Sequence, residues 1–274
     1  MNITFIGGGN MANALIGGLL SKGFAAGTLR VVEPDAETAQ RLAERYGLLV
    51  KATADADILA CDLVLLAVKP QQLRSVAAGL APHLTQQLVL SIAAGVRAAD
   101  LSRWLGGYRR LVRAMPNTPA MVQAGITGLY ALPEVSEEER RRAEAVLAAV
   151  GEVVWVGAEA DMDVITAVSG SGPAYVFYFM EALEEAAIAL GLSASQARRL
   201  SLATFAGAAR LASASREDVV TLRERVTSKG GTTERALAAL EAAGVKPRIV
   251  EAVRAAALRA RELGDELGRD GAAP

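Results

Sequence analysis

The segment "ITFIGGGNMANALIGGLL" combines a β-branched apolar run, a cluster of glycines and an amphipathic helical pattern. Gly7, Gly9 and Ala12 stand in the spacing G-x-G-x-x-A. In this context the first glycine allows a tight turn, the second lets a pyrophosphate approach the backbone, and the alanine lets a helix pack closely on a strand. We therefore predict a dinucleotide-binding turn, with candidate cofactor-binding residues Ile6, Gly7, Gly8, Gly9, Asn10 and Met11.

Glu33 lies at the end of the second candidate strand, "LRVVE". In dinucleotide-binding folds an acidic residue at about this place accepts hydrogen bonds from the adenosine ribose of NAD. An ordinary loop glutamate in "VVEPDAE" explains the residue nearly as well. The sequence therefore predicts NADPH or NADH as the cofactor and leaves the choice between them open.

Three polar turns follow later candidate strands: "AVKPQQ", "SIAAGV" and "AMPNTPA". Ligands of an open parallel sheet bind beyond the carboxyl ends of its strands, so these turns extend the predicted cofactor site. A solvated cation explains Lys69 about as well as contact with an anion does. Asn117 fits both a rigid turn between two prolines and a hydrogen bond to a carboxamide. The candidate residues from these turns are Ala67, Val68, Lys69, Pro70, Ala93 and Asn117.

A second glycine-rich segment, "VTSKGGTT", interrupts alanine-rich helical sequence. Gly230 and Gly231 free the backbone to point successive N–H groups into one concavity, while Ser228 and a helix start at Thr232 add further donors. Such a site suits a carboxylate. A capped loop between helices, with Thr232 or Thr233 as the N-cap, is the competing interpretation. The candidate substrate-binding residues are Ser228, Gly230, Gly231, Thr232 and Thr233.

Composition narrows the kinds of ligand. Lys and Arg total 29 against 30 Asp and Glu, so the net charge of −1 gives no electrostatic reason to expect a nucleic acid or an anionic membrane as partner. The one histidine, His83, and the one cysteine, Cys61, cannot form a soft-metal site or a Cys/His nucleophile pair, so no metal is predicted. Cys61 lies in "ILACDLVLLAV" and is predicted to be a buried small residue.

The start of the chain, "MNITFIGGGN", has neither a basic region nor a cleavable apolar stretch, so we expect mature sequence and no secretion. The longest uncharged run, at 164–180, is shorter than the roughly 20 residues of a membrane span, and "SGSGP" breaks it. A single cysteine fits a reducing compartment. We predict a cytoplasmic protein that acts on a small molecule.

The elements that must position these residues differ between two parts of the chain. Up to about Gly157, apolar runs at 2–6, 29–33, 63–68, 88–92, 110–115 and 152–157 alternate with amphipathic stretches, which is typical of crossover units on a parallel sheet. Helices are predicted there at 10–22 and 35–46, and a third begins at the capping box in Ser136–Glu139.

After Gly157 the strand pattern ends, and helices are predicted at about 161–168, 173–190, 195–212 and 247–267. Several are apolar over more than one face, as in "AYVFYFMEAL", which favours burial against a partner subunit. The fold class predicted is an α/β Rossmann-type N-terminal domain, residues 1–157, followed by an all-α C-terminal domain, residues 158–274.

Five strings occur in order along nearly the whole chain: "IGGGNMA", "AVKPQ", "MPNTP", "SGSGPAY" and "VTSKGGTT". Together they resemble the recurring motifs of the pyrroline-5-carboxylate reductase family, whose members make proline. The resemblance implies a Rossmann domain of the 6-phosphogluconate-dehydrogenase-like kind and a helical domain that interlocks two subunits. Some members of the family join such homodimers into larger rings.

The resemblance also implies an activity, the transfer of a hydride from NADPH or NADH to the C=N bond of 1-pyrroline-5-carboxylate, giving L-proline. Thr233 would offer its hydroxyl to the ring nitrogen of the substrate. The substrate carboxylate would rest on Ser228 and on the amides of Gly231 and Thr232. Imines of this type are readily protonated near neutral pH, so this reaction requires no strong enzymic acid.

Three other kinds of protein share parts of the pattern. By family resemblance, a β-hydroxyacid dehydrogenase needs a lysine on the helix at 173–190, which has none. A metal-dependent ketol-acid reductoisomerase needs convergent carboxylates, whereas Glu181, Glu184 and Glu185 fit one exposed helix face. A nucleotide-binding protein without catalysis has no use for a complete substrate loop, so the sequence favours the enzyme.

Overall fold

The computed structural model describes residues 1–269 of the 274. The chain divides by its internal contacts into two compact units. The first comprises Met1–Ser171 and the described residues from 256 onward, and the second comprises Gly172–Ala255. The predicted division by function, between residues 157 and 158, is a different one and stays a prediction.

The first unit is built on one sheet whose strands, within the described residues, follow the order β3-β2-β1-β4-β5-β6-β7-β8. All neighbouring strands are parallel except β6 and β7. The order reverses direction at β1, the place where ligands bind in doubly wound folds. The strands are β1 (Ile3–Ile6), β2 (Leu29–Val32), β3 (Leu49–Lys51), β4 (Leu63–Leu66), β5 (Leu88–Ser91), β6 (Leu111–Met115), β7 (Gly125–Ala131) and β8 (Gly151–Trp155).

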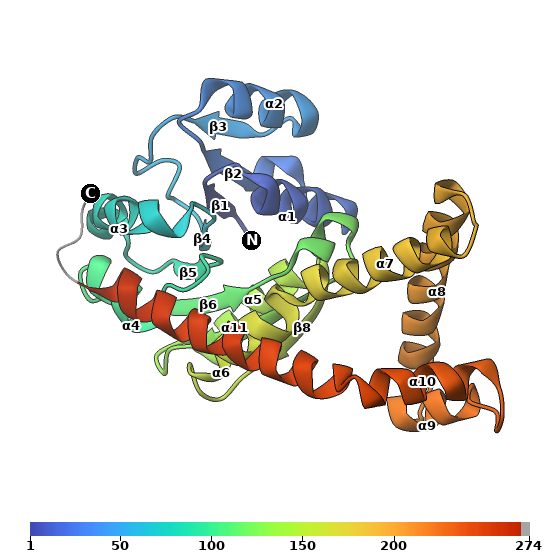
Figure 1. Ribbon diagram of the computed structural model, residues 1–274. Coiled ribbons are helices and arrows are strands. Elements are labelled where there is room, and N and C mark those ends of the chain that lie inside the picture. The colour runs from blue at the N-terminus through green and yellow to red at the C-terminus, as the bar shows by residue number, and fades with distance from the viewer. Residues whose placement is uncertain (270–274) are drawn as a thin grey trace. The chain divides into compact units, whose positions relative to one another are not determined.

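Helices cover both faces of this sheet (Figure 1). On one face lie α1 (Asn10–Ser21), α2 (Ala36–Tyr46) and α5 (Glu137–Leu147), and on the other lie α3 (Pro70–Leu80) and α4 (Ala98–Trp104). The strands alternate accordingly, since Ile3 and Phe5 enter the first core and Ile6 enters the second. Shorter elements are η1 (Ala26–Thr28), η2 (Ala81–His83), η3 (Thr118–Val122), α6 (Asp161–Ile165) and the π-helical turn η4 (Thr166–Gly170).

The long helix α11 (Val245–Gly268) belongs to the second unit at its start and to the first unit at its end. At that end Leu267 packs against the second core. The Arg97 guanidinium donates to the Asp265 carboxylate over 2.6 Å and to the Arg261 carbonyl over 3.2 Å. Apolar contact and ion pairing together hold the last turns of α11 on the first unit.

The second unit consists of α7 (Gly172–Ala189), α8 (Ala194–Ala214), α9 (Val219–Arg225), α10 (Thr232–Ala242) and the first turns of α11. α7 and α8 pack together, and the Ser201 hydroxyl donates to the Met180 carbonyl over 3.1 Å. Of residues 172–255 only Ala197 and Ser201 are buried. This unit therefore has almost no core of its own.

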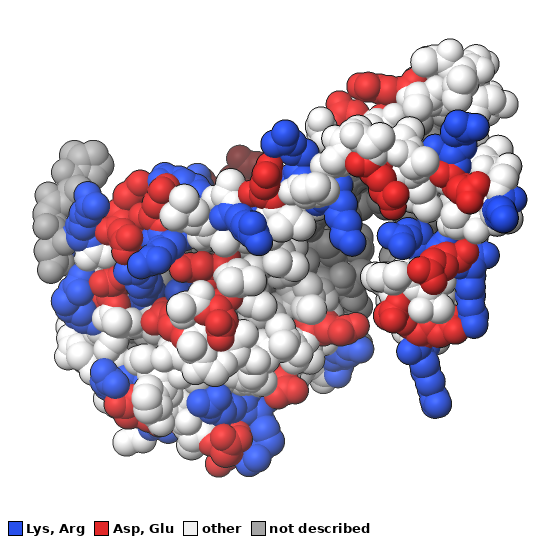
Figure 2. Space-filling view, turned by 60° about the horizontal axis from the view of Figure 1, so that its bottom comes forward, with Lys and Arg blue, Asp and Glu red and all other residues white. Residues whose placement is uncertain are grey.

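The predicted fold class, a Rossmann-type domain followed by an all-helical C-terminal part, is confirmed. Basic and acidic side chains intermingle on the face seen in Figure 2, in keeping with a net charge of −1. Among residues 1–269, no helix is both long enough and apolar enough to cross a membrane.

Candidate active site

The glycine-rich turn joins β1 to α1, and its backbone conformation requires a glycine at position 7. Gly7 has φ +100°, which strains any residue with a side chain, and a Cβ there would lie 2.9 Å from the Ala67 carbonyl oxygen. Its N–H donates to the Val32 carbonyl over 2.8 Å, so the turn is pinned between β2 and the end of β4. The predicted tight turn at Gly7 therefore has a structural cause.

At Gly9, in contrast, neither backbone conformation nor packing requires a glycine. It is the N-cap of α1 with φ −68°, which any residue can adopt, and a Cβ there would meet nothing within 4 Å. No side chain caps the first turn of α1, so its first N–H groups have no capping partner. The absence of a side chain at Gly9 leaves room for a ligand against the helix N-terminus, which fits the pyrophosphate of a dinucleotide. Ala12 is fully buried, as close helix–strand packing requires.

A cavity of about 550 Å³ opens at the carboxyl ends of β1, β2 and β4. It is lined by eight of the predicted cofactor residues, namely Ile6, Gly7, Gly8, Gly9, Glu33, Ala67, Val68 and Lys69. Sequence reasoning missed its other walls, among them Ala52–Ala54 after β3 and Gln72 on α3. Recognising β3 as a strand would have identified 52–54, because they follow its carboxyl end.

Glu33 points its carboxylate into the glycine-rich turn. One oxygen accepts a hydrogen bond from the Gly8 N–H over 2.8 Å, and the other accepts one from the Asp35 N–H over 2.9 Å. The carboxylate thus ties the end of β2 to the turn after β1. This structural role is one reason for a glutamate at position 33, and its contact with a ribose stays a prediction.

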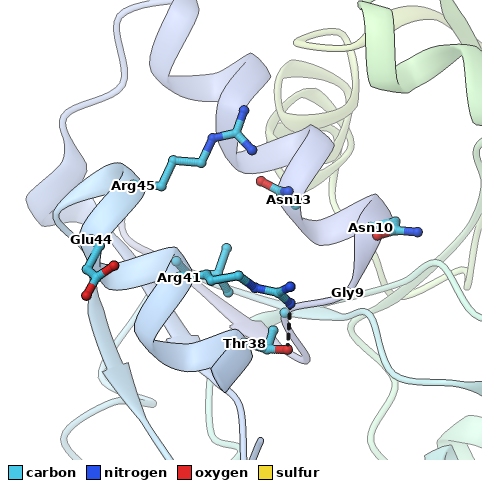
Figure 3. Close-up of a pocket in the computed structure, with 9 residues that line it drawn as sticks. Gly9, Asn10, Asn13, Thr38, Arg41, Glu44 and Arg45 are labelled. Atoms are coloured by element: carbon cyan, nitrogen blue, oxygen red, sulfur yellow. Dashed lines mark hydrogen bonds between the residues drawn. The ribbon is translucent and has the colours of Figure 1, made fainter. Parts of the chain in front are cut away.

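A second cavity, of about 700 Å³, lies between the start of α1 and α2. Figure 3 shows Arg41 and Arg45 extending from α2 into this space, with Asn13 of α1 across from them. Gly8 and Gly9 line this cavity as well as the first one, so the two meet at the glycine-rich turn. Neither arginine was predicted as a site residue, because α2 reads as an ordinary amphipathic helix.

Asn117 is 8% exposed and is bonded within the fold. Its Nδ2 donates to the Ser169 carbonyl over 3.1 Å, and its Oδ1 accepts from the Ile126 N–H over 3.0 Å. The "MPNTP" turn is therefore tied to the "SGSGP" turn and to β7. A Cβ at Gly170 would lie 2.6 Å from the Met115 Cε, which explains this glycine by packing.

The remaining predicted cofactor residues lie near the turn without lining the first cavity. Asn10 lines the cavity between α1 and α2. Met11 packs on the core, Pro70 begins α3, and Ala93 is buried after β5. Contact between any of these residues and a cofactor stays a prediction.

In the second unit, "VTSKGGTT" opens α10 at Thr232, as predicted. The N-cap is Gly231 and no side chain caps the helix, so the competing interpretation is wrong in naming Thr232 or Thr233 as N-cap, although the segment is a loop between α9 and α10. Gly230 has φ +74°, and a Cβ at Gly231 would lie 2.6 Å from the Ser228 Oγ, so neither glycine is replaceable without strain.

The loop forms one wall of a cavity of about 480 Å³, lined by Gly230, Gly231, Thr232, Glu234, Arg235 and Ala238. Ser228 and Thr233 are not among its lining residues. Within this loop the Gly231 N–H donates to the Ser228 carbonyl over 3.0 Å, and the Gly230 N–H donates to the Glu234 carboxylate over 2.7 Å. An acidic side chain, which sequence reasoning missed, already lies against the proposed anion site.

Other candidate chemistry in the described residues is limited. No group of three or more His, Cys, Asp or Glu among residues 1–269 is arranged to hold a metal ion. Burial raises the pKa of the Cys61 thiol, which disfavours the reactive thiolate. The chemistry that remains is that of backbone and hydroxyl donors around two glycine-rich turns.

Two protein-family models match the chain. Residues 159–263 match a model described as pyrroline-5-carboxylate reductase dimerisation. Residues 2–95 match one described as NADP oxidoreductase, coenzyme F420-dependent. Each match falls in one of the two parts that the sequence pattern distinguishes.

Individual relatives match over nearly their whole length. A pyrroline-5-carboxylate reductase from Pseudomonas aeruginosa is 45% identical over 97% of this chain and 98% of the relative. The structure of a pyrroline-5-carboxylate reductase from Coxiella burnetii is similar with a TM-score of 0.91, at 43% identity, over 96% of this chain and 98% of that one. The Plasmodium falciparum pyrroline carboxylate reductase with NADP bound has a TM-score of 0.84, at 29% identity and the same coverage. The resemblance carried by the five motifs is confirmed.

Proposed function

The chain belongs to the pyrroline-5-carboxylate reductase family and is an NAD(P)-dependent oxidoreductase, and on that premise we propose the part that each glycine-rich turn plays in reducing 1-pyrroline-5-carboxylate to L-proline. The observation that carries this proposal is a pair of helix N-termini that have a glycine as N-cap and no side-chain cap. α1 begins after Gly9 and α10 after Gly231, and neither has a side-chain hydrogen bond at its N-cap.

Among the described residues, four other helices have an ordinary side-chain cap, whereas α3, α4 and α6 also begin without one but not after a glycine. Asp35, Ser136, Ser193 and Asp218 each accept a hydrogen bond from the first turn of the helix that follows. The two glycine-rich turns give up that stabilisation, which is typically about 1 kcal/mol per cap. Helix N-termini without a capping side chain instead suit anionic groups of a ligand, a pyrophosphate at α1 and a carboxylate at α10.

NADPH or NADH, when bound, supplies the hydride that reduces the imine carbon. The amides at Gly9 and Asn10 would hold its pyrophosphate, and the cavity at the carboxyl ends of β1, β2 and β4 would hold its adenosine. Lys69 is exposed at the rim of that cavity and adds a positive charge there. These residues bind and orient the cofactor and take no part in proton transfer.

At the second turn, Ser228 and the amides of Gly231 and Thr232 would hold the substrate carboxylate, with the Gly231 N–H exchanging its present hydrogen bond to the Ser228 carbonyl. The Thr233 hydroxyl would then be directed to the ring nitrogen. Because the imine is protonated near neutral pH, neutral donors are sufficient to hold the reactive form. Fixing the two reacting carbons face to face supplies most of the rate, an effect worth up to roughly 7–11 kcal/mol.

The activity is tested by incubating the purified protein with 1-pyrroline-5-carboxylate and NADPH, and separately with NADH, and following the loss of dihydronicotinamide absorbance. We expect substrate-dependent loss and formation of proline. A protein that binds the nucleotide but consumes none of it in the presence of this substrate would contradict the proposed function.

The role of the first turn is tested by Gly9→Val. The backbone of Gly9 is extended and a Cβ there meets nothing, so the variant is expected to fold while its side chain blocks the pyrophosphate. Gly27→Val is the matched control, because a Cβ at Gly27 also meets nothing within 4 Å and Gly27 lines neither cavity at the turn. Equal affinity of both variants for NADPH would refute the role given to Gly9.

We also propose that the protein is a cytoplasmic homodimer, in which residues 158–274 form the dimerisation and substrate domain. The family match to residues 159–263 supports the division, and the poor burial of residues 172–255 supports the dimer. A larger ring of such dimers is a further possibility that the family offers. Cys61 is the one cysteine of the chain, so a reducing compartment suits it.

A further inference from the structure

We infer that Arg41, with Thr38 and Arg45 beside it, binds the 2′-phosphate of NADPH and makes the protein prefer NADPH to NADH. The inference rests on the proposed function only in placing a dinucleotide at the glycine-rich turn. The 2′-phosphate on the adenosine ribose is the one chemical difference between the two cofactors. A preference between them must therefore come from residues that can reach that phosphate.

The cavity between α1 and α2 has the right neighbours for this group. It shares Gly8 and Gly9 with the cavity at the strand ends, so it adjoins the predicted position of the pyrophosphate and of the ribose beside it. Its far wall is α2, which contributes Thr38, Arg41 and Arg45. A phosphate placed here would lie between two cationic side chains and a hydroxyl.

Arg41 is oriented toward the turn. Figure 3 shows its guanidinium reaching toward Gly9, and one of its N–H groups donates to the Thr38 Oγ1 over 3.0 Å. The nearest carboxylate oxygen of Glu37 is 3.8 Å away, between side chains that are 67% and 84% exposed, so this ion pair contributes little. A guanidinium has five donors, and most of those on Arg41 remain for a phosphate.

The other charges around the cavity favour an anion. Arg45 is four residues after Arg41, on the same side of α2, and its guanidinium lies over the Tyr46 ring at 5.0 Å. Glu44 also lines the cavity, but Figure 3 shows its carboxylate on the opposite side of α2 from the two arginines. Of the three charged residues that line the cavity, two are arginines.

Glu33, the residue that suggests NADH from the sequence, is engaged elsewhere. Both of its oxygens accept hydrogen bonds from backbone amides, at Gly8 and at Asp35. Its carboxylate therefore braces the turn. Arg41 decides the cofactor preference, because a guanidinium binds a phosphate with strong charge-assisted hydrogen bonds.

The test uses two nucleotides that differ by this phosphate alone, 2′,5′-ADP and 5′-AMP, titrated calorimetrically into the protein without substrate. We expect the wild type to bind 2′,5′-ADP at least about tenfold more tightly than 5′-AMP, and Arg41→Ala to lose about tenfold in affinity for 2′,5′-ADP but less than about twofold for 5′-AMP. Arg41→Lys keeps the charge but lacks the paired donors of the guanidinium, so it is expected to retain part of the preference for the 2′-phosphate.

Arg142→Ala is the matched control, because Arg142 on α5 also pairs with a glutamate one turn earlier and lines neither cavity. Equal binding of the two nucleotides by the wild type, or an equal loss of both in Arg41→Ala, would overturn the inference. These titrations need no turnover. A failure here leaves the reductase activity standing, and an inactive protein with the expected binding leaves this inference standing.

Discussion

At the scale of single residues, the hydroxyl of Thr233 is the group we expect to contact the reacting ring. Thr233 is half-buried in the first turn of α10. Replacing it by alanine leaves the ring nitrogen without a partner, which costs about 1–3 kcal/mol and lowers kcat/KM about tenfold or more. Steady-state kinetics of Thr233→Ala checks this, and Thr233→Ser, which keeps the hydroxyl, should restore most of the activity. An unchanged kcat/KM in folded Thr233→Ala would remove Thr233 from the site.

The charge of Glu234 is expected to act against a substrate carboxylate bound at the loop before α10. Its carboxylate accepts a hydrogen bond from the Gly230 N–H over 2.7 Å, so a negative charge lies beside the amides proposed for the substrate carboxylate. Glutamine keeps the acceptor and removes the charge. Because an exposed charge interaction is worth about 0.2–1 kcal/mol, Glu234→Gln should lower KM for 1-pyrroline-5-carboxylate by up to about fivefold.

The kinetics separate this effect from a structural one. In Glu234→Gln we expect kcat to stay the same and added salt to reduce the difference in KM from the wild type, since salt screens an exposed charge. Glu234→Ala also loses the hydrogen bond that orders the loop, so its KM should not improve equally. A higher KM in Glu234→Gln would show that the carboxylate helps substrate binding.

At the scale of elements, two strands, β3 and β7, were not predicted from the sequence, and each has a physical reason for its weak strand pattern. β3 has three residues, none of them buried, so it is too short and too exposed to give a recognisable strand pattern. β7 is interrupted by Gly128, where a Cβ would lie 2.5 Å from the Ile165 Cγ2. The glycine that weakens the strand pattern is required by the helix packed on it. The remaining strands alternate or run apolar, and their predicted positions are confirmed within a few residues.

The residues of the candidate site also fall into two groups, those that the sequence predicted and those that it did not. Local sequence identified the two glycine-rich turns, because a glycine spacing between a strand and a helix has a local cause. Arg41 could not be identified from the sequence, since its place beside Gly9 depends on how α2 packs against α1. The internal bonds of Asn117 were hidden for a similar reason, because its partners Ser169 and Ile126 come together only in the folded sheet.

Glu139 of helix α5 is expected to make the stability of the fold depend on pH. The Glu139 side chain is 5% exposed, and burial alone would raise its pKa. Hydrogen bonds from the Ser136 amide and hydroxyl, together with Arg110, outweigh burial and lower the pKa below the ordinary 4.5. A carboxyl group with a lowered pKa stabilises the fold above its ordinary value, and this stabilisation is lost as pH falls through the folded value.

Glu139→Gln should therefore lower the melting temperature most near neutral pH, and the difference from the wild type should shrink as the pH falls below about 4.5. At neutral pH the loss corresponds to about 1–3 kcal/mol of unfolding free energy. Glu137→Gln, on the same helix but at a side chain that is 81% exposed, is the control and should change little. Thermal melts at several pH values check this. A difference that does not depend on pH would show that packing, and not charge, makes Glu139 important.

At the scale of the whole molecule, the second unit requires a partner. With only Ala197 and Ser201 buried among residues 172–255, this part of the chain cannot stabilise itself through a core. Its helices expose large apolar side chains, including Phe177 at 63%, Tyr178 at 71% and Leu190 at 87%. Faces of this kind are typical of an interface that is buried in the assembled protein. A second copy of the same unit is the partner that the family match to residues 159–263 supports.

Phe177→Glu tests this assembly. In a two-fold symmetric dimer the substitution occurs twice, and each copy loses about 2 kcal/mol of apolar burial, so the dissociation constant should rise by about a thousandfold. Sedimentation should then show a 28.5 kDa monomer where the wild type sediments as a dimer or larger. Leu49→Glu is the control, because Leu49 is 53% exposed on β3 in the first unit and should leave the oligomer unchanged. If the wild type is itself monomeric at micromolar concentration, or if Phe177→Glu assembles like the wild type, α7 does not form the interface.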